Sequence, residues 1–309
     1  MADHLIDSWA ADTAPVVRLS TPGELAAAVP VLLGFRPRES LVMVALGGDR
    51  LRVGLVQRVD LADLRLDTAA VARLVRNARS SAAAAVVAVV VTGAPLDLAR
   101  GQRPGGDVAD AVRDACAEAG VALVDLLAVC GDRWVSYLCD DPSCCPPEGT
   151  PVAAAGSTAL EAAAVVAGQV IRPDRAAVLA QVAPVGYLAL EAVEQALGRV
   201  AADPGAIPTG EAAVRLVEAA LAAPPEAGPR DVDLLARLLL AVAQLPVRDR
   251  LLGRCVGPAA EEAQALWLEL TRRAPVDLVA APATLLAVSA YAAGDGLLAR
   301  AALDRVLAA

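Results

Sequence analysis

The stretch GDRWVSYLCDDPSCCPPEG, residues 131–149, marks the point at which the chain changes character. Upstream of it, short apolar runs alternate with helical patterns, whereas downstream of it the apolar residues recur only with helical spacing. The stretch itself holds three of the six cysteines, one of the three tryptophans and one of the three tyrosines. We therefore predict an α/β domain over residues 1–150 and an all-helical domain over residues 151–309.

The upstream part predicts a mixed sheet. After a helix that ends near Leu33, apolar runs at 41–46 and 51–59 flank a Gly-Gly-Asp-Arg turn, which is typical of a hairpin. A helix over 67–78, a strand over 85–92, a helix over 107–119 and a second hairpin over 121–138 follow. A right-handed crossover would make the centre of the sheet parallel. The predicted fold class is an α/β sandwich of the order hairpin-α-β-α-hairpin.

The downstream part predicts eight helices, separated mainly by proline and glycine. They lie near 159–168, 174–182, 185–202, 210–222, 231–244, 258–273, 282–293 and 296–308. The last two form a hairpin with small residues at the crossing, which resembles a tetratricopeptide-type unit. A single unit does not make a solenoid, so we predict an irregular helical bundle.

Composition excludes several classes of function. The net charge is −9, and neither half is basic, so we expect no nucleic-acid partner. The longest uncharged apolar run, 82–91, is too short to span a bilayer, and no signal peptide is evident, so we expect a cytoplasmic protein without a membrane partner. All 27 basic residues are arginine and the one histidine is His4, which argues against lysine-based and histidine-based catalysis.

Five segments carry a family resemblance. They are VPVLLGFRPRESLV at 29–42, RVDL at 58–61, RWVSYLC at 133–139, PSCCPPEGTP at 142–151 and a C-terminal pattern over 285–303, with LLA at 285–287, GDG at 294–296, Ala299, Ala302 and Leu303. Together they resemble an actinobacterial family of unknown function, domain of unknown function 4192. The resemblance covers nearly the whole chain and implies no activity. The candidate structural residues within these segments are Gly34, Phe35, Pro37, Trp134, Tyr137, Pro146 and Gly149.

The cysteines at Cys139, Cys144 and Cys145 have three interpretations. The first is structural, with small thiols packed under a proline-rich turn against Trp134 or Tyr137. The second is a zinc site, which would need a fourth ligand such as Cys130, Cys116 or Asp141. The third is a redox switch that forms a reversible disulfide. The sequence implies no cofactor beyond this zinc alternative.

A second set of candidates surrounds the first predicted hairpin. Arg58 ends one strand whose partner begins near Ser40, so polar groups from both strands can meet at one end of the sheet. Paired arginines could hold a carboxylate or a phosphate there, although a structural Arg–Asp pair is the simpler interpretation. The candidate ligand-binding residues are Arg36, Arg38, Ser40, Arg58 and Asp60, with Glu39 between them. The loop 93–106 follows a central strand, where α/β sheets usually bind ligands.

The absence of lysine and the single histidine favour a non-enzymatic binding or scaffold protein. Its helical domain would engage an unknown protein partner or a second copy of the chain. The alternatives are an enzyme that uses carboxylates and arginine on a small anionic ligand, and a cysteine redox-switch or zinc module. The enzyme hypothesis predicts a deep pocket lined by Arg36, Arg58 and Asp60.

Overall fold

The computed structural model describes residues 17–48, 50–67, 69–96, 103–223, 230–257 and 260–308. His4 and residues 97–102 of the predicted 93–106 loop lie outside the described residues. The chain divides into two compact units, an α/β unit that ends at Arg175 and a helical unit that spans Ala176–Ala309. Each unit is described by itself.

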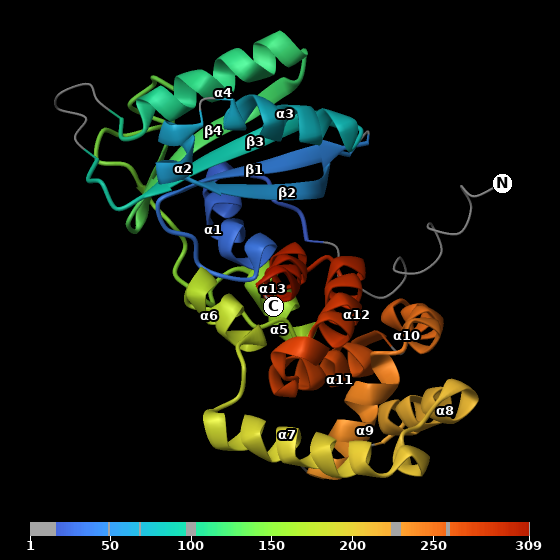
Figure 1. The fold of residues 1–309 in the computed structure, drawn as a ribbon. Coiled ribbons are helices and arrows are strands. Elements are labelled where there is room, and N and C mark those ends of the chain that lie inside the picture. Colours follow the sequence, from blue (N-terminus) through green and yellow to red (C-terminus); the bar gives the residue numbers. More distant parts are fainter. Residues whose placement is uncertain are drawn as a thin grey trace. The chain divides into compact units, whose positions relative to one another are not determined.

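The α/β unit contains one six-stranded sheet of order β2-β1-β3-β4-β5-β6 (Figure 1). The pair β3–β4 is parallel and every other neighbouring pair is antiparallel. Both predicted hairpins and the parallel centre of the sheet are confirmed. The short strand β6 was not predicted, because two residues show no pattern. The strands are β1 Ser40–Gly47, β2 Arg52–Asp60, β3 Ala83–Thr92, β4 Ala122–Cys130, β5 Arg133–Ser136 and β6 Thr150–Pro151.

Helices cover both faces of the sheet (Figure 1). Helices α3 (Ala70–Ser80) and α4 (Gly106–Ala119) pack on one face, and α1 (Pro22–Leu33) packs on the other. Alternate residues of β3 point to opposite faces: Val86 and Val90 join the core under α3 and α4, whereas Val87 and Val89 join the core under α1. This explains why the strand reads as an uninterrupted apolar run.

The helix ends follow local hydrogen bonds, and two differ from expectation. The helix predicted to start at Asp67 is α3, which begins at Ala70. Asp67 does lie at its start, since the Asp67 Oδ1 accepts the Ala69 N–H at 3.0 Å and the Asp67 carbonyl accepts the Ala70 N–H at 3.1 Å. The Asp67 N–H donates to the Asp63 carbonyl and so ends α2 (Leu61–Leu66). Helix α4 begins one residue before the predicted range of 107–119: its N-cap residue is Gly105, and Asp107 lies in its first turn.

The second part of the chain is mostly helical, as predicted, although β6 reaches Pro151. The core of the helical unit contains the fully buried Trp267, Leu235 and Leu285. The seven-residue α10 was not predicted as a separate helix. The helices after the sheet are α5 Ala159–Val166, which lies in the α/β unit, and α6 Arg175–Leu179, α7 Tyr187–Ala202, α8 Gly210–Leu221, α9 Val232–Val242, α10 Leu245–Leu251, α11 Ala260–Arg273, α12 Ala280–Ala292 and α13 Gly296–Leu307.

One stretch of the described chain, Arg175–Ala202, is long and apolar enough to cross a membrane by length and composition. Its mean hydropathy is 1.6, and 17% of the window is buried. The helical backbone of this stretch is interrupted at residues 183–186, between a 3-10 turn and α7.

Candidate functional site

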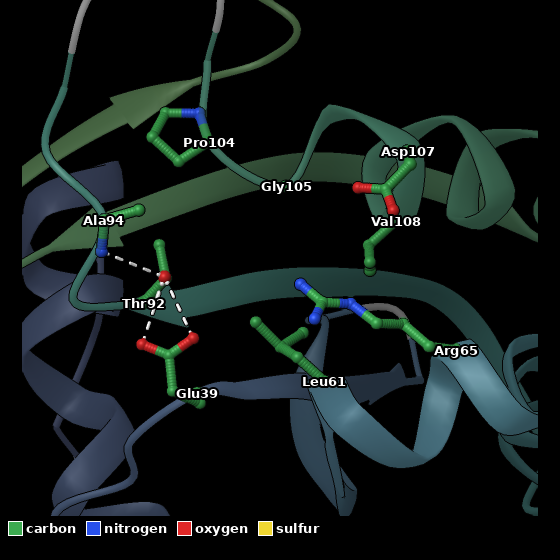
Figure 2. Close-up of a pocket in the computed structure, with 9 residues that line it drawn as sticks. All are labelled: Glu39, Leu61, Arg65, Thr92, Ala94, Pro104, Gly105, Asp107 and Val108. Atoms are coloured by element: carbon green, nitrogen blue, oxygen red, sulfur yellow. Dashed lines mark hydrogen bonds between the residues drawn. The ribbon is translucent and has the colours of Figure 1, made fainter.

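A cavity of about 250 Å³ lies at the carboxyl end of β3, between α2 and the first turn of α4 (Figure 2). The cavity lies between the end of a central strand and the start of the helix that follows it in the chain. Open α/β sheets commonly bind ligands at this position. We call the cavity the β3 pocket. Its lining residues are Glu39, Leu61, Arg65, Thr92, Ala94, Pro104, Gly105, Asp107 and Val108.

Glu39 places a carboxylate on one wall of the β3 pocket. Its side chain accepts hydrogen bonds from the Thr92 Oγ1 at 3.1 Å and from the Gly93 N–H at 2.6 Å, as Figure 2 shows for Thr92. Its backbone carbonyl accepts the Leu61 N–H at 2.8 Å. The φ angle of Glu39 is 39°, a left-handed conformation that is uncommon for a residue with a Cβ atom. Such strain persists only where the surroundings fix it, and it concentrates at functional sites.

Arg65 brings a positive charge to the same pocket. Its guanidinium extends from α2 toward the middle of the cavity, whereas the Asp107 carboxylate lies near the opposite side on α4 (Figure 2). Within the described parts of the chain, the Arg65 guanidinium makes no hydrogen bond or ion pair. A cation without a protein partner, next to the positive end of α4, is free to hold an anionic group of a ligand.

The pocket wall at the start of α4 is fixed by close packing. Gly105 has φ 78°, and a Cβ atom there would lie 2.9 Å from the Val90 Cγ1. The Tyr137 hydroxyl donates a hydrogen bond to the Pro104 carbonyl. Burial raises the pKa of Tyr137 well above its usual range, so its hydroxyl keeps the proton that this bond needs.

The predicted arginine cluster is only partly assembled, and its groups bond to one another. The Arg58 Nε donates to the Ser40 Oγ at 2.9 Å and its Nη1 donates to the Asp60 Oδ2 at 2.9 Å. The Ser40 Oγ in turn donates to the Arg38 carbonyl at 2.5 Å. The Arg58 side chain is 14% exposed, whereas Arg36 and Arg38 are exposed. This arrangement ties together the two strands at one end of the hairpin.

That cluster lines neither the β3 pocket nor the groove beside the cysteine loop described below, because Arg36, Arg58 and Asp60 are absent from both linings. Glu39 is the member of the segment that faces the β3 pocket. Sequence reasoning did not single out Arg65, Thr92 or Asp107. A signal existed for Thr92, since it is the polar residue that ends an apolar strand, but none existed for Arg65, because α2 was not expected.

The three cysteines of the 139–145 loop do come together. The Sγ atoms of Cys139, Cys144 and Cys145 all lie within 4.8 Å of one another. The Asp141 carbonyl accepts the N–H groups of Cys144 at 3.1 Å and Cys145 at 2.7 Å, which closes the turn. Cys139 and Cys145 are half-buried, whereas Cys144 is exposed. The other proposed cysteine ligands, Cys116 and Cys130, are instead buried in the core under α4.

Local contacts distinguish the three thiols. A hydrogen bond from the backbone of Asp141, with further bonds from the thiols of Cys145 and Cys144, lowers the pKa of Cys139. Burial raises the pKa of Cys145 to about 11. The hydrogen bond to Cys139, together with the nearby negative charge of its thiolate, raises the pKa of Cys144.

A second, open groove borders the cysteine loop on one side. It is lined by Arg103, Arg113, Tyr137 and Cys145, among others. Arg103 donates to the carbonyls of Ser136 at 2.7 Å and Cys139 at 2.9 Å, so it holds the start of the loop against the end of β5.

The candidate structural residues lie at the junctions of the α/β unit. Gly34 ends α1, and the chain around the buried Phe35 pairs with Arg172, where the Arg36 N–H donates to the Arg172 carbonyl at 3.0 Å. Pro37 is buried, and Trp134 packs in the core under α1. The Pro146 carbonyl accepts the Gly149 N–H at 2.8 Å.

Comparison with known proteins places the chain in a family. Neither the comparison with curated proteins nor the comparison with solved structures found a match. The family model described as a domain of unknown function, DUF4192, matches residues 22–309, which is nearly the whole chain. The protein therefore belongs to the DUF4192 family.

Proposed function

We propose that this protein is a non-enzymatic binding protein of the cytoplasm. Its α/β unit holds a small polar ligand in the β3 pocket, and its helical unit contacts a protein partner or a second copy of the chain. One observation supports the proposal most strongly: two groups of opposite charge line the same cavity of the described chain. The Glu39 carboxylate is held by hydrogen bonds, and the Arg65 guanidinium makes no hydrogen bond or ion pair there.

The pocket chemistry suits a ligand with two kinds of group. Arg65 and the start of α4 favour a carboxylate or phosphate. The Glu39 carboxylate is an acceptor, so it favours a hydroxyl or ammonium group that donates. At about 250 Å³, the cavity is smaller than most drug-binding pockets, so it fits a small metabolite. Hydroxy acids, amino acids and small sugar phosphates all combine these groups.

Exposed apolar side chains support a protein-binding role for the helical unit. Tyr187 on α7, Tyr291 on α12 and Leu307 on α13 are 77%, 78% and 81% exposed. Tyrosine is enriched among the residues that contribute most to binding at protein interfaces. The net charge of −9 favours such a partner over nucleic acid or an anionic membrane surface.

Thermal unfolding in the presence of defined ligands tests the proposal. The purified chain is heated with members of three panels: hydroxy acids, amino acids and sugar phosphates. A ligand present at 100 times its dissociation constant adds about 2.7 kcal/mol of stability, which should raise the unfolding temperature of the α/β unit by several degrees. At the same ligand concentration the shift should fall by about half or more in Arg65→Ala and persist in Arg36→Ala. A failure of all three panels, or an equal shift in Arg65→Ala, would contradict the proposal.

The same pocket also supports a second candidate, an enzyme that uses carboxylates and arginine. The observation that favours it is that Glu39 and Asp107 both line the cavity that holds Arg65. Two carboxylates around a bound anion can divide acid and base roles. Any ligand that stabilises the protein should therefore be incubated with it and followed by NMR. New product signals that depend on Glu39 would favour the enzyme over the binding protein.

A further inference from the structure

We infer that Cys139, Cys144 and Cys145 form a binding site for one zinc ion, separate from the β3 pocket. Their three Sγ atoms already converge within 4.8 Å of one another. In tetrahedral zinc sites the Zn–S bonds are about 2.3 Å long, which sets neighbouring sulfurs about 3.8 Å apart. Inward movement of each thiol by less than about 1 Å would complete this geometry, which is within the reach of side-chain rotation.

The loop is held in place without help from an ion. The Asp141 carbonyl fixes the backbone of Cys144 and Cys145, and Arg103 fixes the carbonyl of Cys139. Pro142, Pro146 and Pro147 restrict the backbone on both sides. Preorganised ligands lose little conformational entropy on binding, so the three thiols need only small adjustments to close on a cation.

Simple packing explains only part of the cluster. Cys145 packs against the core under α1, whereas Cys144 is exposed and does not contribute to a core, unlike the buried Cys116, Cys130 and Cys255. The number of thiols matters too, because a disulfide would use two and leave the third without a role. The Asp141 carboxylate already accepts hydrogen bonds from Ser143, so we expect water to be the fourth ligand on the exposed side.

The charges around the loop are mixed. On binding, each thiol releases its proton to the buffer, and three thiolates with one Zn²⁺ carry a net charge of −1. Arg103 is only 22% exposed, and its guanidinium contacts both the Cys139 carbonyl at 2.9 Å and the Asp140 carboxylate at 3.0 Å. Because the Asp140 carboxylate offsets its charge, Arg103 supports the site by holding the backbone of Cys139 in place. Arg103 is therefore a positioning residue for the site.

Zinc analysis of the full chain tests the inference. The reduced protein is stripped with a chelator, titrated with Zn²⁺ and desalted, and its metal content is measured. Co²⁺ serves as a spectroscopic probe, because thiolate ligands give charge-transfer absorption in the near ultraviolet and a tetrahedral site gives visible bands. We expect one ion per chain. We also expect Arg103→Ala to weaken zinc affinity about 10–100-fold, as loss of a supporting residue usually does.

Matched cysteine variants make the result specific. Cys139→Ser, Cys144→Ser and Cys145→Ser should each lose zinc more severely than Arg103→Ala, whereas Cys116→Ala, Cys255→Ala and the pocket variant Glu39→Gln should retain one ion. Circular dichroism checks that each variant is folded. Failure to bind zinc in the folded, reduced protein would overturn the inference. Zinc that stays bound in all three serine variants would also overturn it. So would a disulfide that forms in air while no zinc is retained, which mass spectrometry would show as a loss of about 2 Da.

Discussion

Substitution of Gly149 by alanine should destabilise the α/β unit. Gly149 has φ 75°, and a Cβ atom there would lie 2.6 Å from the Leu96 Cδ1 and 3.2 Å from the Trp134 carbonyl oxygen. The left-handed backbone costs a residue with a Cβ atom about 1–2 kcal/mol. The contact with Leu96 can relax by side-chain movement, but the carbonyl belongs to β5, so overpacking adds about 1–3 kcal/mol. We expect a total loss of about 2–5 kcal/mol.

Gly131 supplies a matched control. Its φ is 64°, but among the described residues, its two chain neighbours apart, no atom lies within 4 Å of the position that a Cβ atom would take. Gly131→Ala therefore puts a Cβ atom on a residue with a left-handed backbone without crowding any neighbour. It should lower the free energy of unfolding by only about 1–2 kcal/mol. The difference between the two variants isolates the close approach of Gly149 to β5.

Hydrogen exchange read by mass spectrometry measures the effect in the α/β unit alone. Amides of β3 and β4 exchange through opening of the core, so their protection reports its stability. Because about 1.4 kcal/mol corresponds to a factor of ten, Gly149→Ala should reduce protection by about 30-fold or more. Peptides from α11 and α12 should change little. Equal losses in Gly149→Ala and Gly131→Ala would refute the packing argument.

Two further predictions concern single hydrogen-bonded groups. Arg58→Lys removes the paired contact with Asp60 and the hydrogen bond to Ser40. Urea unfolding should therefore show that the free energy of unfolding falls by about 1–3 kcal/mol in Arg58→Lys and almost not at all in Arg36→Lys. Equal losses in the two variants would contradict the hydrogen bonds described for Arg58. Burial acts to raise the pKa of Glu161, but hydrogen bonds from Gly156 and Thr158 outweigh it and hold that pKa below 4.5. The wild type should therefore be more stable than Glu161→Gln near neutral pH, and this difference in the free energy of unfolding should vanish as the pH falls through the lowered pKa. A stability difference that grows in acid would contradict this prediction.

The sheet could be predicted from the sequence because its signals are local. The continuous apolar run of β3 indicates a strand with two covered faces, and the Gly-Gly-Asp-Arg turn fixes the β1–β2 hairpin. Next to the turn Gly47 pairs with Arg52 and Leu46 with Val53, and that register continued along the hairpin would place Ser40 opposite Val59. A bulge between Val44 and Leu46 shifts the pairing by one residue, so Ser40 lies opposite Asp60 and Val42 opposite Arg58. The sequence therefore places Ser40, Arg58 and Asp60 at the same end of the hairpin, but the bulge, which decides which residues face each other, shows no local pattern.

The β3 pocket depends on information that no local pattern carries. Glu39 meets Thr92 because β1 pairs with β3, with Ser40 opposite Val91, a contact between residues far apart in the sequence. Arg65 was missed because α2 is six residues long, too short to show a helical period. Helix α10 was missed for the same reason. Helix α3 begins at Ala70 rather than directly after Asp67, although the Asp67 side chain still accepts the Ala69 N–H at its start.

Titration calorimetry on the β3 pocket tests the central claim most directly. The panel member that raises the unfolding temperature most is titrated into the wild type, Glu39→Gln, Arg65→Ala and the exposed-arginine control Arg36→Ala. A lost hydrogen bond to a charged group is worth about 1.5–3 kcal/mol, so both pocket variants should bind at least about tenfold more weakly. Arg36→Ala should bind as the wild type does. Unchanged affinity in Glu39→Gln and Arg65→Ala, with a loss in Arg36→Ala, would contradict the proposal that this pocket is the binding site.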